Sequence, residues 1–305
     1  MSRRAAFVFP GQGSQRVGML DRLPDPEAVA RLLVRAETLT GLPLGSIATE
    51  GPDAALADTR AAQPLLYIVD LLWARAVADA GVSPAVVAGH SLGEYAALAF
   101  AGVFDDETGL GLICERSRLM ADAAAAAGGT MAAVLGMDPG SVVSAIDGIS
   151  GVWVANDNGP GQVVISGTHA GIEHALQALT AVGARRVVPL SVAGPFHSPL
   201  MAPAADAFSA VLAQAPFADA RVPVVQNTGA EPVIEAETLR ARLSAQIVSP
   251  VGWTATLEAF VAAGVDIQVE CGPGSVLTGI VKRYPGLEGV SVETDGIERV
   301  REVIG

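Results

Sequence analysis

The chain has 305 residues, half of them hydrophobic, which is enough for one large domain or a large domain with a smaller insert. Its formal net charge of −13 argues against nucleic acid and anionic membranes as partners, because both attract basic surfaces. No apolar stretch approaches the about 20 residues of a membrane span, and the run before Pro10 is too short for a signal peptide. Cys114 and Cys271 lie far apart without metal-ligand spacing, so we expect reduced, buried thiols in a soluble, cytoplasmic protein.

The amino-terminal part alternates short apolar runs with helical patterns. Residues 5–9 form an apolar run that Pro10-Gly11 stops, which is typical of a buried strand. The expected elements of this part are strands at 5–9 and 84–88, a long apolar helix at 61–80, a helix that begins at Glu94, and a helix from a cap at Asp105 or Asp106 to Ala127.

From residue 129 the pattern changes to short strands and helices. Strands are expected at 130–135, 152–155, 162–166 and 186–192, helices at 138–146 and 172–181, and a turn at 156–161. This order, β-α-β-β-α-β, is the split arrangement of ferredoxin-like domains. We therefore expect a ferredoxin-like α+β subdomain over 129–191, inserted into an α/β hydrolase-like core of residues 1–128 and 192–305. The core would hold a parallel sheet that also includes strands near 222–226 and 267–270.

The pentapeptide Gly89-His90-Ser91-Leu92-Gly93 lies between a predicted strand and a predicted helix. Strand, G-x-S-x-G and helix together make a nucleophile elbow, whose glycines allow a turn too tight for larger side chains. The turn exposes the Ser91 hydroxyl, and the backbone N–H of Leu92 at the helix N-terminus can stabilise an oxyanion. The pattern predicts Ser91 as a nucleophile.

A serine nucleophile needs a base, and the chain offers four histidines. His90 adjoins Ser91, so its side chain should leave the turn in another direction and pack. His169 and His174 fall on a polar helix and are expected at the surface. His197 lies in a Gly- and Pro-bounded loop after an apolar strand, where catalytic groups are often carried. We predict His197 as the base.

A third catalytic group is not evident from the sequence. The hydrolase order would place an Asp or Glu between Ser91 and His197, but every acid there falls at a predicted cap, helix face or turn. A dyad, in which a backbone carbonyl orients the imidazole, fits equally well.

Arg116 and Arg118 lie two residues apart on an Ala-rich helix and must point to different faces. An inward arginine after a nucleophile elbow could bind a substrate carboxylate in a bidentate pair. Spacing alone instead favours two solvated side chains that pair with Glu115 or Asp122.

Six motifs occur in a characteristic order. They are Phe9–Gln15, Gly89–Ala97, Arg116–Met120, Asn156–Gly167, Phe196–Met201 and Glu270–Gly279. Together they resemble the malonyl-coenzyme A:acyl carrier protein transacylases, discrete enzymes of fatty acid synthesis that also occur as acyltransferases of polyketide synthases. The resemblance covers nearly the whole chain and implies the same core with a ferredoxin-like insert.

The resemblance implies a role for each matching residue. Ser91 would be acylated by malonyl-coenzyme A (malonyl-CoA), His197 would be the general base, and Arg116 rather than Arg118 would hold the malonyl carboxylate. Gln12 would contribute to the oxyanion hole beside the Leu92 amide, and Gln246 would orient His197 through its backbone carbonyl, which agrees with the missing carboxylate.

Phe196 precedes the predicted base. In polyketide acyltransferases that resemble this chain, this position is Phe in malonyl-specific enzymes and Ser in methylmalonyl-specific ones. Discrete fatty acid transacylases often carry Ser there as well, so Phe196 departs from that subgroup. The resemblance implies that Phe196 sets malonyl selectivity, whereas packing of the loop is the alternative.

The implied reaction is a ping-pong acyl transfer to the phosphopantetheine thiol of an acyl carrier protein, with no metal or redox cofactor. We expect a monomer without nucleic-acid or membrane partners. A malonyltransferase for malonate decarboxylase and a stand-alone polyketide acyltransferase are open alternatives. A serine thioesterase would share Ser91 and His197 but use a carboxylate third member and no arginine.

Overall fold

The computed structural model describes residues 3–305, which form an α/β protein with two sheets. The larger sheet contains β1 (Ala5–Phe9), β2 (Val86–Gly89), β7 (Val224–Val225), β8 (Pro232–Val233), β10 (Ile267–Glu270) and β11 (Glu288–Ser291). Their order is β11-β10-β1-β2-β7-β8, and only the edge pair β7 and β8 is antiparallel. The parallel sheet is as predicted, although β7 is shorter than the expected strand at 222–226 and β8 and β11 were not predicted.

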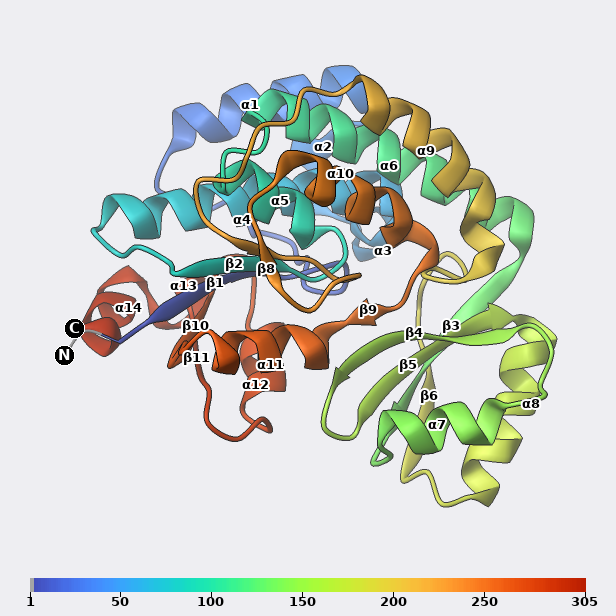
Figure 1. The fold of residues 1–305 in the computed structure, drawn as a ribbon. Coiled ribbons are helices and arrows are strands. Elements are labelled where there is room, and N and C mark those ends of the chain that lie inside the picture. Colours follow the sequence, from blue (N-terminus) through green and yellow to red (C-terminus); the bar gives the residue numbers. More distant parts are fainter. Residues whose placement is uncertain (1–2) are drawn as a thin grey trace.

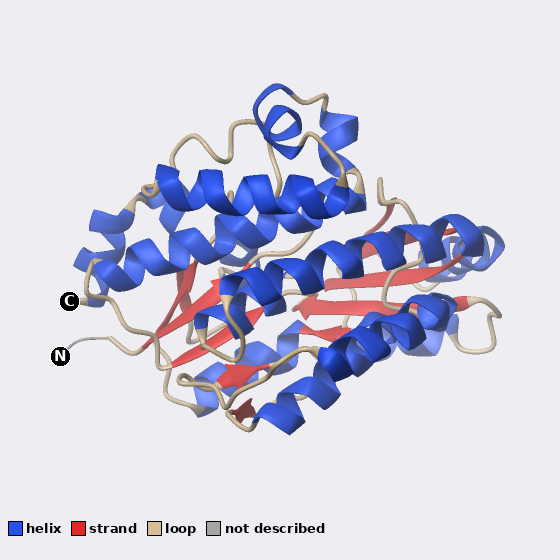
Figure 2. Ribbon diagram, turned by 90° about the horizontal axis from the view of Figure 1, so that it is seen from above, coloured by secondary structure: helices blue, strands red, loops and turns tan. Residues whose placement is uncertain are grey.

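Helices cover both faces of this sheet (Figure 1 and Figure 2). Strand side chains such as Phe7 and Val87 face one apolar cluster, and Ala6 and Val8 face another, so the strands are buried on both sides. The first face is covered by α1 (Pro26–Thr40), α4 (Thr59–Asp79), α5 (Gly93–Phe100), α6 (Asp106–Ala127) and α9 (Ala202–Gln214), and the second by α11 (Trp253–Ala262) and α12 (Val276–Val281). Other helices are α2 (Leu44–Glu50), α3 (Asp53–Ala57), α10 (Ala236–Ala245), α13 (Val292–Asp295) and α14 (Ile297–Ile304), with 3₁₀ turns η1 (Pro199–Met201) and η2 (Gln246–Val248).

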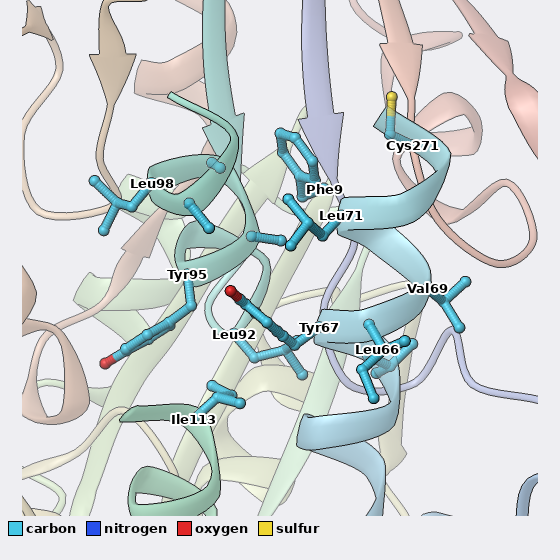
Figure 3. Packing of buried hydrophobic residues seen from close by; sticks show 14 of the residues in the cluster. Phe9, Leu66, Tyr67, Val69, Leu71, Leu92, Tyr95, Leu98, Ile113 and Cys271 are labelled. Atoms are coloured by element: carbon cyan, nitrogen blue, oxygen red, sulfur yellow. The ribbon is translucent and has the colours of Figure 1, made fainter. Parts of the chain in front are cut away.

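Helix α4 lies in the middle of the core. Figure 3 shows its side chains among those of β1 and α5, including Leu71, Phe9 and Tyr95. Against our expectation, α4 is long and apolar enough to cross a membrane, but 83% of its most apolar window is buried inside the protein. Its composition is therefore that of a core helix. Cys271 and Cys114 are both free and buried, as predicted.

The second sheet is built mainly from residues 129–189. Its strands are β3 (Gly129–Leu135), β4 (Val152–Gly159), β5 (Gln162–Thr168), β6 (Arg186–Pro189) and β9 (Val251–Gly252), in the order β6-β3-β5-β4-β9. Helices α7 (Pro139–Ile146) and α8 (His169–Ala181) pack against it around their own apolar cluster. The predicted order β-α-β-β-α-β is confirmed, and the caps Asp138 and Thr168 begin the two helices by accepting backbone N–H bonds.

Two predictions about this sheet were wrong in detail. The expected turn at 156–161 is reduced to Pro160-Gly161, because β4 continues to Gly159 through two bulges. Asn156 and Asp157 pair on one side with β5 and on the other with β9, which the sequence did not predict. The expected strand at 186–192 ends at Pro189, and the chain beyond it lines a cavity.

Candidate active site

Ser91 occupies the turn between β2 and α5, and its φ is +52°. A left-handed conformation costs a non-glycine residue roughly 1–2 kcal/mol, so the surroundings must hold it. The turn is tight: a Cβ at Gly89 would lie 1.9 Å from the Gly93 carbonyl carbon, and one at Gly93 would lie 2.1 Å from Phe9 O. The predicted elbow is confirmed as a strand–turn–helix with Ser91 at its apex.

His197 lies in the loop between β6 and η1, with φ +56°. Its Nε2 is 2.8 Å from Ser91 Oγ, and its Nδ1 faces Gln246 O at 3.2 Å and Ser249 O at 3.1 Å. Two carbonyl acceptors require a proton on Nδ1, which leaves the lone pair of Nε2 for the serine hydroxyl. Burial, then the nearby Arg116 and His90, lowers the pKa of His197 to about 3. The imidazole is therefore neutral and able to accept a proton.

The hydrogen bonds of His197 show which groups take the place of a third catalytic side chain. Two backbone carbonyls orient the imidazole, which is the dyad alternative, and one of them belongs to Gln246 as the resemblance implied. Ser249 was missed, because a carbonyl acceptor leaves no signature in the residue type.

Arg116 is fully buried, and its guanidinium group lies beside the Ser91 hydroxyl. Its Nη2 donates to Ser91 Oγ at 3.1 Å and to Gln246 Oε1 at 3.0 Å, and its Nη1 donates to Gln63 Oε1 at 2.8 Å. Among residues 3–305, Arg116 forms no ion pair with Asp or Glu, and its Nε has no partner. Burial lowers its pKa from the ordinary value. A buried cation with only neutral partners is an incomplete site for an anion.

Arg118 points the other way. It is exposed and pairs with Glu115 and Asp122 on its own helix. The expectation that the two arginines differ in direction is confirmed, and the spacing-based interpretation of two solvated side chains was wrong for Arg116.

The side chains of Gln246 and Gln63 were not predicted to matter. Gln246 Nε2 donates to Ser91 O at 3.0 Å, so this residue connects the nucleophile, the base and Arg116. The Gln63 carboxamide accepts from Arg116 through its Oε1 and donates to the Met120 sulfur through its Nε2. Gln63 was overlooked because the helix around it is strongly apolar. A polar residue in such a helix is expected to be buried and therefore to need a polar partner, which is a signal of a site.

Gln12 and Leu92 flank the serine from two loops. The side-chain Nε2 of Gln12 donates to Ala57 O at 3.4 Å and to Thr59 Oγ1 at 3.3 Å, which leaves the backbone N–H as the remaining donor of this residue. Within residues 3–305, neither the Gln12 nor the Leu92 backbone N–H has an acceptor. Two unsatisfied donors beside a nucleophile fit an oxyanion hole.

Ser91, Leu92, Gln12 and His197 line one cavity of about 140 Å³ at the seam between the two sheets. The buried Arg116 is not part of the lining and bonds Ser91 Oγ and Gln63, which are. The cavity wall combines core residues such as Gln12, Gln63 and Met120 with Met131 and Asn156 of the second sheet, and Phe196, which is 6% exposed. His90 turns away from the serine to bond Asn158 and lie against Trp253, while His169 and His174 are exposed on α8, as expected. Among residues 3–305, no three His, Cys, Asp or Glu side chains lie close enough to ligate a metal.

Comparisons with known proteins agree with this geometry. The acyl transferase domain family matches residues 6–294. The chain is 42% identical to the malonyl CoA-acyl carrier protein transacylase of Synechocystis sp., over 92% of this chain and 93% of that protein. It is 39% identical to the transacylase of the same name from Bacillus subtilis, over 92% and 90%.

Solved structures agree as well. The malonyl CoA-acyl carrier protein transacylase of Coxiella burnetii superposes with a TM-score of 0.93 at 33% identity, covering 100% of this chain and 98% of that one. A malonyl-transacylase in complex with its type II polyketide acyl-carrier protein gives a TM-score of 0.91 at 36% identity, covering 99% of each chain. The chain therefore belongs to the acyl transferase domain family and, within it, to the malonyl-CoA:acyl carrier protein transacylases.

Proposed function

We propose that this chain is an acyl-carrier-protein S-malonyltransferase, which moves a malonyl group from malonyl-CoA to the phosphopantetheine thiol of an acyl carrier protein. The observation that carries the proposal is the buried Arg116, 3.1 Å from Ser91 Oγ and without an acidic partner among residues 3–305. A substrate with a free carboxylate supplies the missing anion and brings its thioester beside the nucleophile. The family membership and the names of the relatives support the same assignment.

In the first half-reaction Ser91 Oγ attacks the thioester carbonyl while His197 Nε2 takes its proton. The carbonyl oxygen becomes an oxyanion, which the backbone N–H groups of Leu92 and Gln12 stabilise. The C–S bond then breaks, His197 returns the proton to the leaving sulfur, and CoA departs as the thiol. The product is a malonyl ester on Ser91, with its carboxylate on Arg116.

The second half-reaction runs through the same groups. The phosphopantetheine thiol of the carrier protein gives its proton to His197 and attacks the ester carbonyl. The C–O bond breaks, Ser91 recovers its proton, and malonyl-carrier protein leaves. Gln246 orients His197 through its carbonyl and Arg116 through its side chain, so one residue aligns base and substrate anchor.

We assign residues 1–128 and 192–305 to an α/β hydrolase-like core and 129–191 to a ferredoxin-like subdomain. The elbow at the end of a parallel strand supports the first assignment, and the strand order β6-β3-β5-β4 with two helices on one face supports the second. A monomer in the cytoplasm stays a prediction.

Intact-mass spectrometry tests the function directly. The natural enzyme mixed with malonyl-CoA should gain one malonyl group and lose it when holo acyl carrier protein is added. Ser91→Ala should fold normally and gain none. Labelling of the Ser91→Ala variant, or no labelling of the natural enzyme, contradicts the proposal.

Two alternatives are separated by the same assay. A thioesterase would release malonate into water without a carrier protein, and the carbonyl-oriented His197 with a buried Arg116 argues against it. A stand-alone malonyl transacylase of polyketide synthesis has one specific likeness in its favour, the transacylase solved with its polyketide carrier. Transfer rates to fatty acid and polyketide carrier proteins, compared side by side, identify the pathway.

A further inference from the structure

Two side chains from distant loops bond the left-handed backbone of Ser91: Gln246 bonds its carbonyl, and Asn227 bonds its N–H. Asn227 follows β7 and is 5% exposed. Its Oδ1 accepts the Ser91 backbone N–H at 2.7 Å, and its Nδ2 donates to Gly89 O at 2.6 Å. One carboxamide therefore connects the last residue of β2 with the serine at the apex of the turn. A donor on one side and an acceptor on the other fix which way the amide points.

Asn227 is itself fixed by buried polar contacts. Its backbone N–H donates to Glu94 Oε2 at 2.9 Å, and its carbonyl accepts from Gly252 N at 3.2 Å. The other oxygen of Glu94 accepts from Gln226 Nε2 at 2.9 Å, and Glu94 is fully buried on α5, three residues beyond Ser91. The carboxylate thus ties the helix arm of the turn to the same loop.

These contacts separate the serine N–H from the reaction. Because the Ser91 N–H bonds Asn227, it cannot stabilise the oxyanion, and that task is left to Leu92 and Gln12. The Ser91 hydroxyl must meet His197 Nε2 and the thioester carbon together, so its direction depends on the backbone conformation that the Asn227 bonds span. Among residues 3–305, Asn227 forms no hydrogen bond with Arg116 or Gln63, and it is not one of the residues that line the cavity.

We propose that Asn227 is a positioning residue for acyl transfer, holding Ser91 in its strained conformation through the bridge to Ser91 N–H and Gly89 O. The proposal rests on the proposed function, because it concerns the same serine. It assigns Asn227 no contact with substrate.

The test is the rate of Ser91 acylation by malonyl-CoA in a single turnover, followed by quenched-flow mass spectrometry. Asn227→Ala should slow it on the order of 10²-fold, as expected for a misplaced nucleophile. Transfer to the carrier protein should slow by a similar factor, since both half-reactions use Ser91, whereas a docking defect would affect only one. Binding of malonyl-CoA, measured in a Ser91→Ala background, should be the same with and without Asn227→Ala.

Gln226→Leu is the matched control. It removes a hydrogen bond to Glu94 from the neighbouring residue and leaves both bonds across the elbow in place. Its acylation rate should stay within about threefold of the natural rate, even where its melting temperature falls like that of Asn227→Ala. Equal slowing of the two variants, or an Asn227→Ala enzyme that acylates normally, overturns the proposal.

Two further measurements keep the test decisive. Asn227→Asp keeps an acceptor for Ser91 N–H and loses the donor to Gly89, so its rate should lie between those of the natural enzyme and Asn227→Ala. If Asn227→Ala does not fold, equal rates for Asn227→Asp and Gln226→Leu overturn the proposal.

A small fluorophosphonate that labels Ser91 needs neither Arg116 nor a carrier. Normal labelling of Asn227→Ala by this reagent would also overturn the positioning role, and that result does not depend on malonyl-CoA being the substrate.

Discussion

The two sheets contribute to the cavity in different ways. The ends of β1 and β2 carry Gln12, Ser91 and Leu92, and α6 carries Arg116, each fixed by hydrogen bonds or tight packing. The second sheet contributes wall residues such as Met131 and Asn156. The reacting groups therefore belong to the core, while shape and access are set at the seam. This division predicts that a substitution of a reacting group has a larger effect than one in the cavity wall or at the surface.

The sharpest test compares two arginines on one helix. Arg116→Ala leaves a malonyl carboxylate unpaired in a buried site, a loss of a few kcal/mol or on the order of 10²-fold or more in malonyl transfer. An acetyl group never uses that contact, so acetyl transfer should persist or rise. Arg118→Ala removes only exposed ion pairs and should change either rate little. A larger loss in Arg118→Ala would contradict the assignment.

A seam residue should affect selectivity more than rate. Phe196 lines the cavity beside His197, and we propose that its ring takes volume that an α-methyl group would need. One methyl group in a tight pocket is worth about 1–3 kcal/mol, or roughly 10–200-fold. Competing malonyl- and methylmalonyl-CoA should show strong malonyl preference, and Phe196→Ser should narrow it. An unchanged ratio in a folded variant would place the gate elsewhere.

The end of the second sheet beside α12 brings together two basic pairs that are distant in sequence. Arg186 and Gln162 both pair with Leu135, and Arg283 donates to the Gln162 side chain at 2.6 Å. Arg185 and Lys282 are exposed beside them. In a chain of net charge −13, this cluster is a candidate docking site for an acidic carrier protein.

Charge reversal at this cluster should slow one half-reaction only. Arg186→Glu with Arg283→Glu should reduce transfer to the carrier about tenfold at low salt and leave acylation by malonyl-CoA unchanged. Added salt should slow carrier transfer more than acylation in the natural enzyme. Arg299→Glu, on the exposed face of α14, is the control and should change neither. Equal salt sensitivity of both half-reactions would count against docking here.

The smallest expected effect is that of pH on acylation. With a pKa of about 3, His197 stays neutral in mild acid, so the rate at pH 5 should lie within about twofold of that at pH 8. An imidazole with a pKa near 6.5 would lose roughly 30-fold over that range. A midpoint near pH 6.5 in the acylation profile would contradict this prediction, because it would show that burial does not lower the pKa of His197 in the working enzyme.

The lowered pKa of His197 also affects the stability of the folded protein. The unfolded chain binds a proton on this imidazole below about pH 6.5, whereas the folded protein resists it until about pH 3. The contribution of His197 to stability is therefore complete above the unfolded pKa and is lost as the pH falls through the window between the two values. Urea unfolding of the natural enzyme and of His197→Gln across this window measures it.

Local patterns in the sequence were enough to predict the elbow, the alternating elements and the histidine that faces Ser91, because each depends on neighbouring residues. Partners from distant loops could not be predicted in this way. Ser249 acts through a carbonyl, and Asn227 lies 136 residues from the serine it contacts. The direction of Arg116 depended on packing that spacing does not determine, and the resemblance supplied it. The extension of β4 depended on β9, a strand of two residues with no pattern of its own.

Strand β9 matters for the design of chimaeras. It belongs to the core chain, yet Val251 and Gly252 pair with Asn156 and Asp157 of β4, and Gly252 N also donates to Asn227 O. The edge of the second sheet is thus hydrogen-bonded to the loop that holds the nucleophile. A recombinant that exchanged only residues 129–191 would bring a foreign strand edge against the resident β9 and disturb Asn227. Crossover points that move β4 and β9 together would preserve the elbow while changing the walls of the cavity.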